Sequence, residues 1–129
     1  IMKLKNVLIV VDDIEESIRF YKDLFGLQVI LKQEGNVILS EGLVLQDAKL
    51  WNDTIDEPTT PYNNMTELYF EDDDIEGIVS RIAANNFSAR YVTELTELEN
   101  GQKLFRLYDP TGNLIEVRTP LSYNKDKLI

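Results

Sequence analysis

The chain has 129 residues, of which 43% are hydrophobic and 28% charged, a composition typical of globular proteins rather than disordered ones. Its formal charge of -10 repels nucleic acid phosphates and attracts cationic small molecules. The sequence contains no cysteine and no histidine, which excludes disulfides, thiolate chemistry and the commonest ligand of zinc, iron or nickel.

The length predicts a single domain spanning residues 1–129. No apolar run approaches the roughly 18 residues that a membrane span requires, and the N-terminal residues lack the pattern of a secretory signal. We therefore expect a cytoplasmic protein that has neither membranes nor nucleic acid as partners.

The first part of the chain predicts a βαβββ unit at residues 3–47. Residues 5–11 alternate between two faces, as in a strand, and Asp12 or Asp13 then caps a helix that Gly26 ends. Three strand-like runs follow, LQVILKQ, NVILS and LVLQDA, with turn-forming residues between them. One helix and four strands are therefore expected in this unit.

Residues 48–64 predict a connector, because they lack sustained periodicity and contain Pro58 and Pro61. A second βαβββ pattern follows at residues 65–119, and residues 120–129 form a C-terminal tail.

The two units are related by an internal repeat. The tetrapeptide DDIE at residues 12–15 recurs at residues 73–76, a shift of 61 positions that also aligns the apolar residues of the strands before it. Each unit has a helix on only one sheet face, so pairing the units buries surface and leaves a trough between them. The pattern therefore predicts an α+β fold built from two tandem units.

Two segments carry a resemblance to a known family: NVLIVVDDIEESIRFYKDLFGLQVI in the first unit and LYDPTGNLIEV near the end of the second. Together they resemble the vicinal oxygen chelate superfamily, which includes glyoxalase I, bleomycin resistance proteins and extradiol dioxygenases. The resemblance implies that the two units form a U-shaped mixed sheet around a cavity. It also implies a homodimer.

The resemblance places metal-binding positions at Asn6 and Glu67 on the opening strands and at Gln46 and Glu116 on the closing strands, with Leu45 as the alternative to Gln46 under another hairpin register. None of these residues is histidine. We therefore expect no metal. If a divalent ion binds, the oxygen ligands Gln46, Glu67 and Glu116 would suit Mg, Mn or a similar cation.

Six residues are the candidates for the ligand site, and their roles follow from their chemistry. Carboxylates supply charge or proton transfer, amides supply hydrogen bonds, and aromatic rings supply walls. They are Glu67 and Glu116 as catalytic groups, and Asn6, Gln46, Trp51 and Tyr69 as ligand-binding groups.

Structural roles compete with these assignments. Glu116 is equally able to form an ion pair with Arg106 or Arg118. Tyr69 lies on a strand face that could be solvated, and Trp51 could plug the edge of the core.

The sequence leaves three functions open. The first is a metal-free binder of a cationic or aromatic small molecule, similar to the bleomycin resistance proteins. The alternative is a divalent-metal-dependent lyase or isomerase resembling glyoxalase I with oxygen-only ligands. The third is a relative in fold alone whose role is protein association. Whether the protein is an enzyme is not decided by the sequence.

Overall fold

The structure is a computed structural model that describes residues 1–121, so the predicted tail at 120–129 lies mostly outside the described residues. The chain forms two βαβββ units with an extra helix between them. The elements are β1 (Val7–Val11), α1 (Ile14–Arg19), η1 (Phe20–Leu24), β2 (Val29–Gln33), β3 (Asn36–Leu39), η2 (Ser40–Gly42), β4 (Leu43–Asp47), α2 (Ala48–Ile55), β5 (Leu68–Glu71), α3 (Ile75–Ala84), β6 (Arg90–Glu97), β7 (Lys103–Tyr108) and β8 (Leu114–Arg118).

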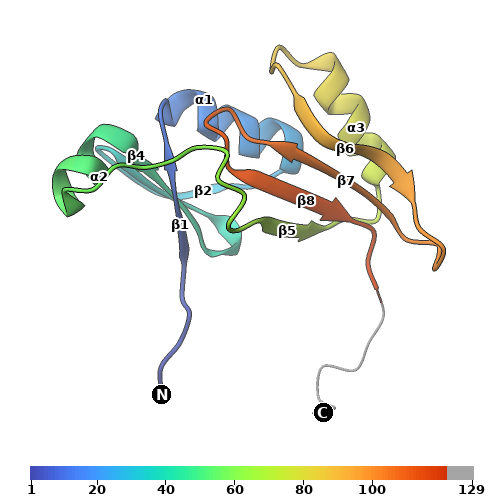
Figure 1. The fold of residues 1–129 in the computed structure, drawn as a ribbon, viewed down its shortest axis with the longest axis horizontal. Helices are drawn as coiled ribbons and strands as arrows, with labels where there is room; N and C mark the ends of the chain where they lie inside the picture. The colour runs from blue at the N-terminus through green and yellow to red at the C-terminus, as the bar shows by residue number, and fades with distance from the viewer. Residues whose placement is uncertain (122–129) are drawn as a thin grey trace.

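The strands form two four-stranded sheets with the same topology (Figure 1). The order is β1-β4-β3-β2 in the first sheet and β5-β8-β7-β6 in the second. In each sheet the opening strand pairs in parallel with the last strand, and the other pairs are antiparallel. This confirms the predicted α+β fold of two βαβββ units. β1 and β5 are edge strands of their sheets.

The paired aspartates at 12–13 and 73–74 lie at helix starts, and the second aspartate of each adjacent pair caps the helix. The Asp13 side chain accepts a hydrogen bond from the Glu16 backbone N–H at 3.0 Å, and the Asp74 side chain accepts one from Gly77 at 3.1 Å. A carboxylate at this position satisfies an N–H group that has no partner within the helix. The recurrence of DDIE in the sequence is therefore a recurrence of helix starts.

The first helix departs from the regular helix that the sequence pattern predicts. After Arg19 it widens into the π-helical turn η1, and it stops before Gly26, whose φ of 73° is left-handed. The turn carries Phe20, Tyr21 and Leu24, all of which are fully or almost fully buried. The wider turn therefore directs neighbouring aromatic residues into the core together.

The two units share one hydrophobic core, made by α1, η1 and α3 together with the strand faces that point toward them. Contacts cross from one unit to the other: the rings of Phe25 and Phe70 lie 5.4 Å apart, and the Arg81 guanidinium donates to the Leu24 carbonyl at 2.9 Å. The opposite faces of both sheets remain available for a site.

The predicted connector is not wholly irregular, because residues 48–55 form α2. The Asp47 side chain caps this helix by accepting from the Leu50 N–H at 3.0 Å, and Asp56 ends it in a left-handed conformation. Two turns of helix are too short for a periodic signal to stand out, but the cap was readable in the sequence. None of the helices within residues 1–121 has the length and apolarity needed to cross a membrane.

Candidate functional site

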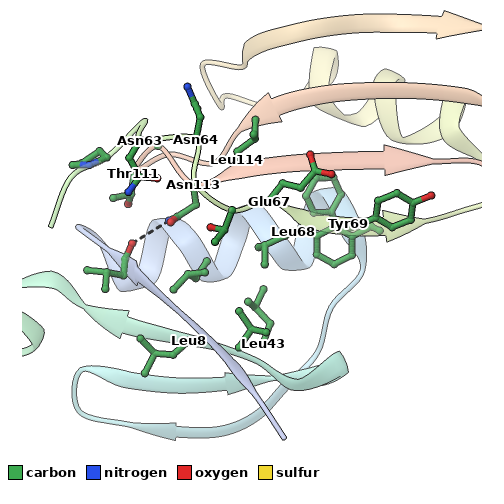
Figure 2. A pocket seen from close by; sticks show the side chains of 18 of the residues that line it. Leu8, Leu43, Asn63, Asn64, Glu67, Leu68, Tyr69, Thr111, Asn113 and Leu114 are labelled. Carbon is green, nitrogen blue, oxygen red and sulfur yellow. Dashed lines mark hydrogen bonds between the residues drawn. The ribbon is translucent and has the colours of Figure 1, made fainter. Parts of the chain in front are cut away.

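A cleft of about 1150 Å³ lies where the two units meet (Figure 2). Consecutive residues of two edge strands, β1 and β5, line it: residues 7–10 of β1 and Leu68–Glu71 of β5. Because successive side chains of a strand point to opposite faces, a lining of consecutive residues means that the strand edges themselves face the cleft. Other walls come from the connector and from the turn before β8.

The cleft is acidic. Glu41, Glu67 and Glu71 line it, and among the lining residues of the described chain there is no lysine or arginine. Glu41 and Glu71 were not among the predicted site residues. The cleft therefore presents carboxylates to a ligand without a basic side chain on its walls.

The DPTGN turn joins the second unit to the first at one end of the cleft. Buried Asp109 organises the turn, because its Oδ1 accepts from the backbone N–H groups of Thr111, Gly112 and Asn113, each at 2.9 Å. The Asn113 side chain then donates to the Val10 carbonyl at 3.0 Å. The turn therefore serves as an attachment between the units.

Two further bonds complete this attachment. The Thr111 hydroxyl accepts from the Asp12 N–H at 2.9 Å, and the buried Tyr21 hydroxyl donates to Asp109 Oδ2 at 2.7 Å. Burial, followed by the charge of Asp109, raises the pKa of Tyr21 well above its ordinary value. Tyr21 therefore stays protonated and serves as a donor.

The connector wall is fixed to the second unit by an aromatic cluster. The Arg90 guanidinium lies 4.5 Å from the centroid of the Tyr62 ring and 5.2 Å from that of Tyr108, a cation–π arrangement. Tyr108 also donates to the Asn64 side chain at 2.6 Å. These contacts hold the connector residues that line the cleft.

Glu116 is buried and paired with two arginines. Its Oε1 accepts from Arg106 Nε at 2.5 Å, and its Oε2 accepts from Arg118 Nε at 2.8 Å. The side chain of Glu116 is only 4% exposed, whereas those of Arg106 and Arg118 are 31% and 23% exposed. The structural alternative considered for Glu116, an ion pair, is present and involves both candidate partners.

Glu67 lies in the electrostatic field of this cluster. Burial is the main cause that raises its pKa above the ordinary 4.5, and the nearby charge of Glu116 raises it further, while Arg106 and Arg118 act in the opposite direction. Glu67 therefore holds a proton more readily than a free glutamate does.

The six predicted site residues divide into two groups. Glu67 and Tyr69 line the cleft, and Glu116 pairs with Tyr69 in the register of β5 and β8. Asn6 is exposed and Trp51 lies half-buried on α2, and neither is a lining residue, nor is Gln46. The structure thus brings Glu67, Tyr69 and Glu116 together and leaves the other three apart.

The register also revises the match between the two closing strands. Val44 lies opposite Leu8 in the first sheet, as Glu116 lies opposite Tyr69 in the second, and Leu8 and Tyr69 are 61 positions apart. Val44 is therefore the counterpart of Glu116, and Gln46 is the counterpart of Arg118. The alternative, Leu45, is fully buried in the core.

These residues do not fit a divalent metal ion. Both oxygens of Glu116 are engaged by arginines, and the Gln46 oxygen accepts from Asn36 at 2.8 Å. Within residues 1–121, no three histidine, cysteine or acidic side chains are grouped so that they could hold a metal. A cation placed beside Glu116 would also meet the positive charge of two guanidinium groups.

Comparison with known proteins gives consistent results. The sequence matches the family model of the glyoxalase-like domain over residues 4–122. A protein of unknown function from Agrobacterium tumefaciens is similar in structure, with a TM-score of 0.78, 28% identity and coverage of 93% of this chain and 95% of that chain. No curated protein matches the sequence.

Two further solved structures carry functional names. A lactoylglutathione lyase from Agrobacterium tumefaciens aligns with a TM-score of 0.67 and 25% identity over 91% of this chain and 92% of that chain. A glyoxalase/bleomycin resistance protein/dioxygenase family enzyme from Burkholderia phytofirmans aligns with a TM-score of 0.73 and 22% identity over 93% and 100%. The repeated βαβββ fold and the family match over nearly the whole chain show that this protein belongs to the glyoxalase-like domain family, within the vicinal oxygen chelate superfamily.

Proposed function

We propose that the protein binds a small organic molecule in the cleft without a metal ion, and that this molecule carries a cationic group on a partly aromatic body. The observation that supports this most directly is the lining of the cleft by Glu41, Glu67 and Glu71 without a lining lysine or arginine among the described residues. Opposite charges attract strongly where the surroundings are partly desolvated.

The remaining lining suits an aromatic body. Phe25, Phe70 and Tyr69 contribute rings, and Leu8 and Leu43 contribute aliphatic surface on the opposite wall (Figure 2). Ligand sites in proteins combine such apolar walls with a few polar groups that fix orientation. We assign the apolar body of the ligand to these walls and its cationic group to Glu67.

We propose a metal-free site because two of the three residues that would hold a metal are engaged elsewhere. Glu116 forms ion pairs with two arginines, and the Gln46 side chain accepts a hydrogen bond from Asn36. The lyase or isomerase alternative requires a metal, and no observation within the described residues favours it over the binder.

We further propose a homodimer. β2 is an edge strand, and all five of its residues are exposed, including Val29, Ile30 and Leu31. Exposed apolar edge strands are sites of association. Sedimentation analysis that gives a monomer mass at micromolar concentration would contradict this part of the proposal.

The test uses a pair of probes with one ring system and opposite charges, tryptamine and indole-3-propanoate, titrated by calorimetry. We expect tryptamine to bind more tightly, and we expect the Glu67→Gln variant to weaken tryptamine binding by about tenfold because one charge-assisted contact is lost. The Glu34→Gln variant is the matched control, because Glu34 is an exposed carboxylate outside the cleft.

The same titration tests the absence of a metal. Tryptamine binding should be unchanged by EDTA or by added Mg²⁺ or Mn²⁺. Equal tryptamine binding by wild type and Glu67→Gln contradicts the cationic ligand. Stoichiometric Mn²⁺ or Mg²⁺ that is lost in Glu116→Ala contradicts a metal-free site and favours the lyase or isomerase.

A further inference from the structure

The arginines around Glu116 supply more positive charge than the buried carboxylate requires. Arg106 on β7 lies directly opposite Glu116 on β8, and Arg118 lies two residues further along β8. One guanidinium is sufficient to neutralise one carboxylate. Holding a second guanidinium in the same cluster places like charges close together, a cost that the nearby carboxylates of Glu67 and Glu71 on or beside β5 reduce.

The two guanidinium groups also keep unused hydrogen-bond donors. A guanidinium carries several N–H groups in a planar fork. Within residues 1–121, the hydrogen bonds of this pair use Nε and Nη1 of Arg106, to Glu116 and Thr93, and Nε of Arg118, to Glu116. Because both side chains are partly exposed, the remaining N–H groups face solvent rather than the core.

Arg106 and Arg118 are not lining residues of the cleft, but they lie beside its lining. Tyr69, which lines the cleft, is the neighbour of Glu116 across β5 and β8, and Glu67 lies close enough for both arginines to act on its ionisation. In the described part of the chain, no hydrogen bond or ion pair joins Glu67 to either arginine. The N–H groups therefore remain available to a ligand held at Glu67.

We propose that Arg106 and Arg118 form an anion subsite that binds a carboxylate of the ligand, so that the ligand is a zwitterion with its ammonium group at Glu67. This inference rests on the proposed function and extends it. A planar carboxylate matches the fork geometry of guanidinium groups, which bind such anions through paired hydrogen bonds.

Comparing the binding of tryptamine with that of L-tryptophan tests the subsite, because the two molecules differ only in the carboxylate of L-tryptophan. In wild type we expect L-tryptophan to bind about tenfold more tightly than tryptamine, the gain of one charge-assisted contact. In Arg118→Gln this preference should disappear, because the carboxylate of L-tryptophan loses its partner. Arg106 still neutralises Glu116 in that variant, which favours folding.

Two controls keep the result decisive. Arg19→Gln removes an exposed arginine that does not line the cleft and should retain the preference for L-tryptophan. If Arg118→Gln does not fold, Arg118→Lys keeps the charge but not the planar fork, and should lose most of the preference.

The inference is overturned if wild type binds L-tryptophan no more tightly than tryptamine, or if the preference persists in folded Arg118→Gln or Arg118→Lys. Its failure differs from failure of the proposed function. The proposed function fails when tryptamine binding does not depend on Glu67, whereas the anion subsite fails when the carboxylate adds nothing.

Discussion

The two units have the same topology but different chemistry on the sheet faces that point away from the helices. In the first unit, Ile38 lies opposite Val44; at the matching place in the second, Arg106 lies opposite Glu116. The first pair is apolar and the second is an ion pair. The repeat therefore retains the strand order and the core, and it differs where a ligand can be bound.

The turns before the last strand of each unit differ in the same way. Ser40–Gly42 in the first unit forms a short 3-10 turn with Glu41 in a left-handed conformation. Residues 109–113 in the second form hydrogen bonds to Val10, Asp12 and Tyr21 of the first unit. The second unit thus carries both the charged cluster and the attachment, and the first supplies a wall.

The largest expected effect tests the two turns against each other. Replacing Asp109 with alanine leaves the donors of its turn and of Tyr21 without their acceptor, and should lower the free energy of unfolding by about 4 kcal/mol. The matched change in the first turn, Glu41→Ala, should cost less than about 0.5 kcal/mol because that side chain is exposed. Urea denaturation measures both. Similar losses in the two variants would remove the proposed asymmetry.

A second prediction transfers the apolar pattern of the first unit into the second. Glu116→Val alone should cost about 3 kcal/mol, because it leaves two guanidinium groups together without their carboxylate. Adding Arg106→Ile and Arg118→Gln should restore stability to within about 1 kcal/mol of wild type, since apolar replacements of buried ion pairs are commonly neutral. A triple variant less stable than Glu116→Val would show that the charged cluster is required for folding.

A smaller effect is expected from Tyr21→Phe, which removes one hydroxyl from the attachment and keeps the buried ring. Loss of the hydrogen bond to Asp109 should cost about 1.5 kcal/mol. Double-mutant cycles with Asp109→Ala should show coupling, because both changes break the same bond. Strict additivity would contradict a direct interaction. Thermal or urea unfolding of the three variants provides the measurement.

The smallest effect concerns Glu67. Folding raises the pKa of Glu67 above the ordinary 4.5. At a pH between the ordinary pKa and the raised pKa, the folded state therefore binds more protons than the unfolded state. The contribution of Glu67 to stability should therefore fall as pH rises through this window, above pH 4.5. The groups facing it are Glu116, Arg106 and Arg118.

Comparing wild type with Glu67→Gln from about pH 4 to about pH 7 isolates this contribution. The variant should lose stability less steeply than wild type as pH rises. The opposite difference in slope would show that the arginines outweigh burial.

Much of the fold was predictable because its signals are local. A capping aspartate, a helical spacing of apolar residues and a stop at Gly26 lie within a few turns of one another, and the repeat doubles the evidence. Helix α2 was missed because two turns give too little periodicity, although Asp47 marks its start. The π-helical turn has no local signal and follows from packing.

The candidate site was less predictable because it depends on distant register. Glu116 was identified with its possible arginine partners, but whether one or both bind it depends on how β7 and β8 align. The predicted match of Gln46 to Glu116 was wrong by two residues, because the counterpart of Glu116 is Val44. A shift of two residues keeps the side chains on the same face of a strand, so the sequence pattern does not reveal it. The acidic lining by Glu41 and Glu71 depends on where the units meet.

The attachment by the DPTGN turn also bears on how the chain is made. The bond from Asn113 to the Val10 carbonyl spans 103 positions, and the bond between Asp12 and Thr111 spans 99. A chain emerging from the ribosome therefore leaves the edge of β1 near Val10 without these partners until residue 113 has been translated. Translational pausing before the codon for Asp109 would prolong the interval in which that edge is accessible to chaperones or to other nascent chains.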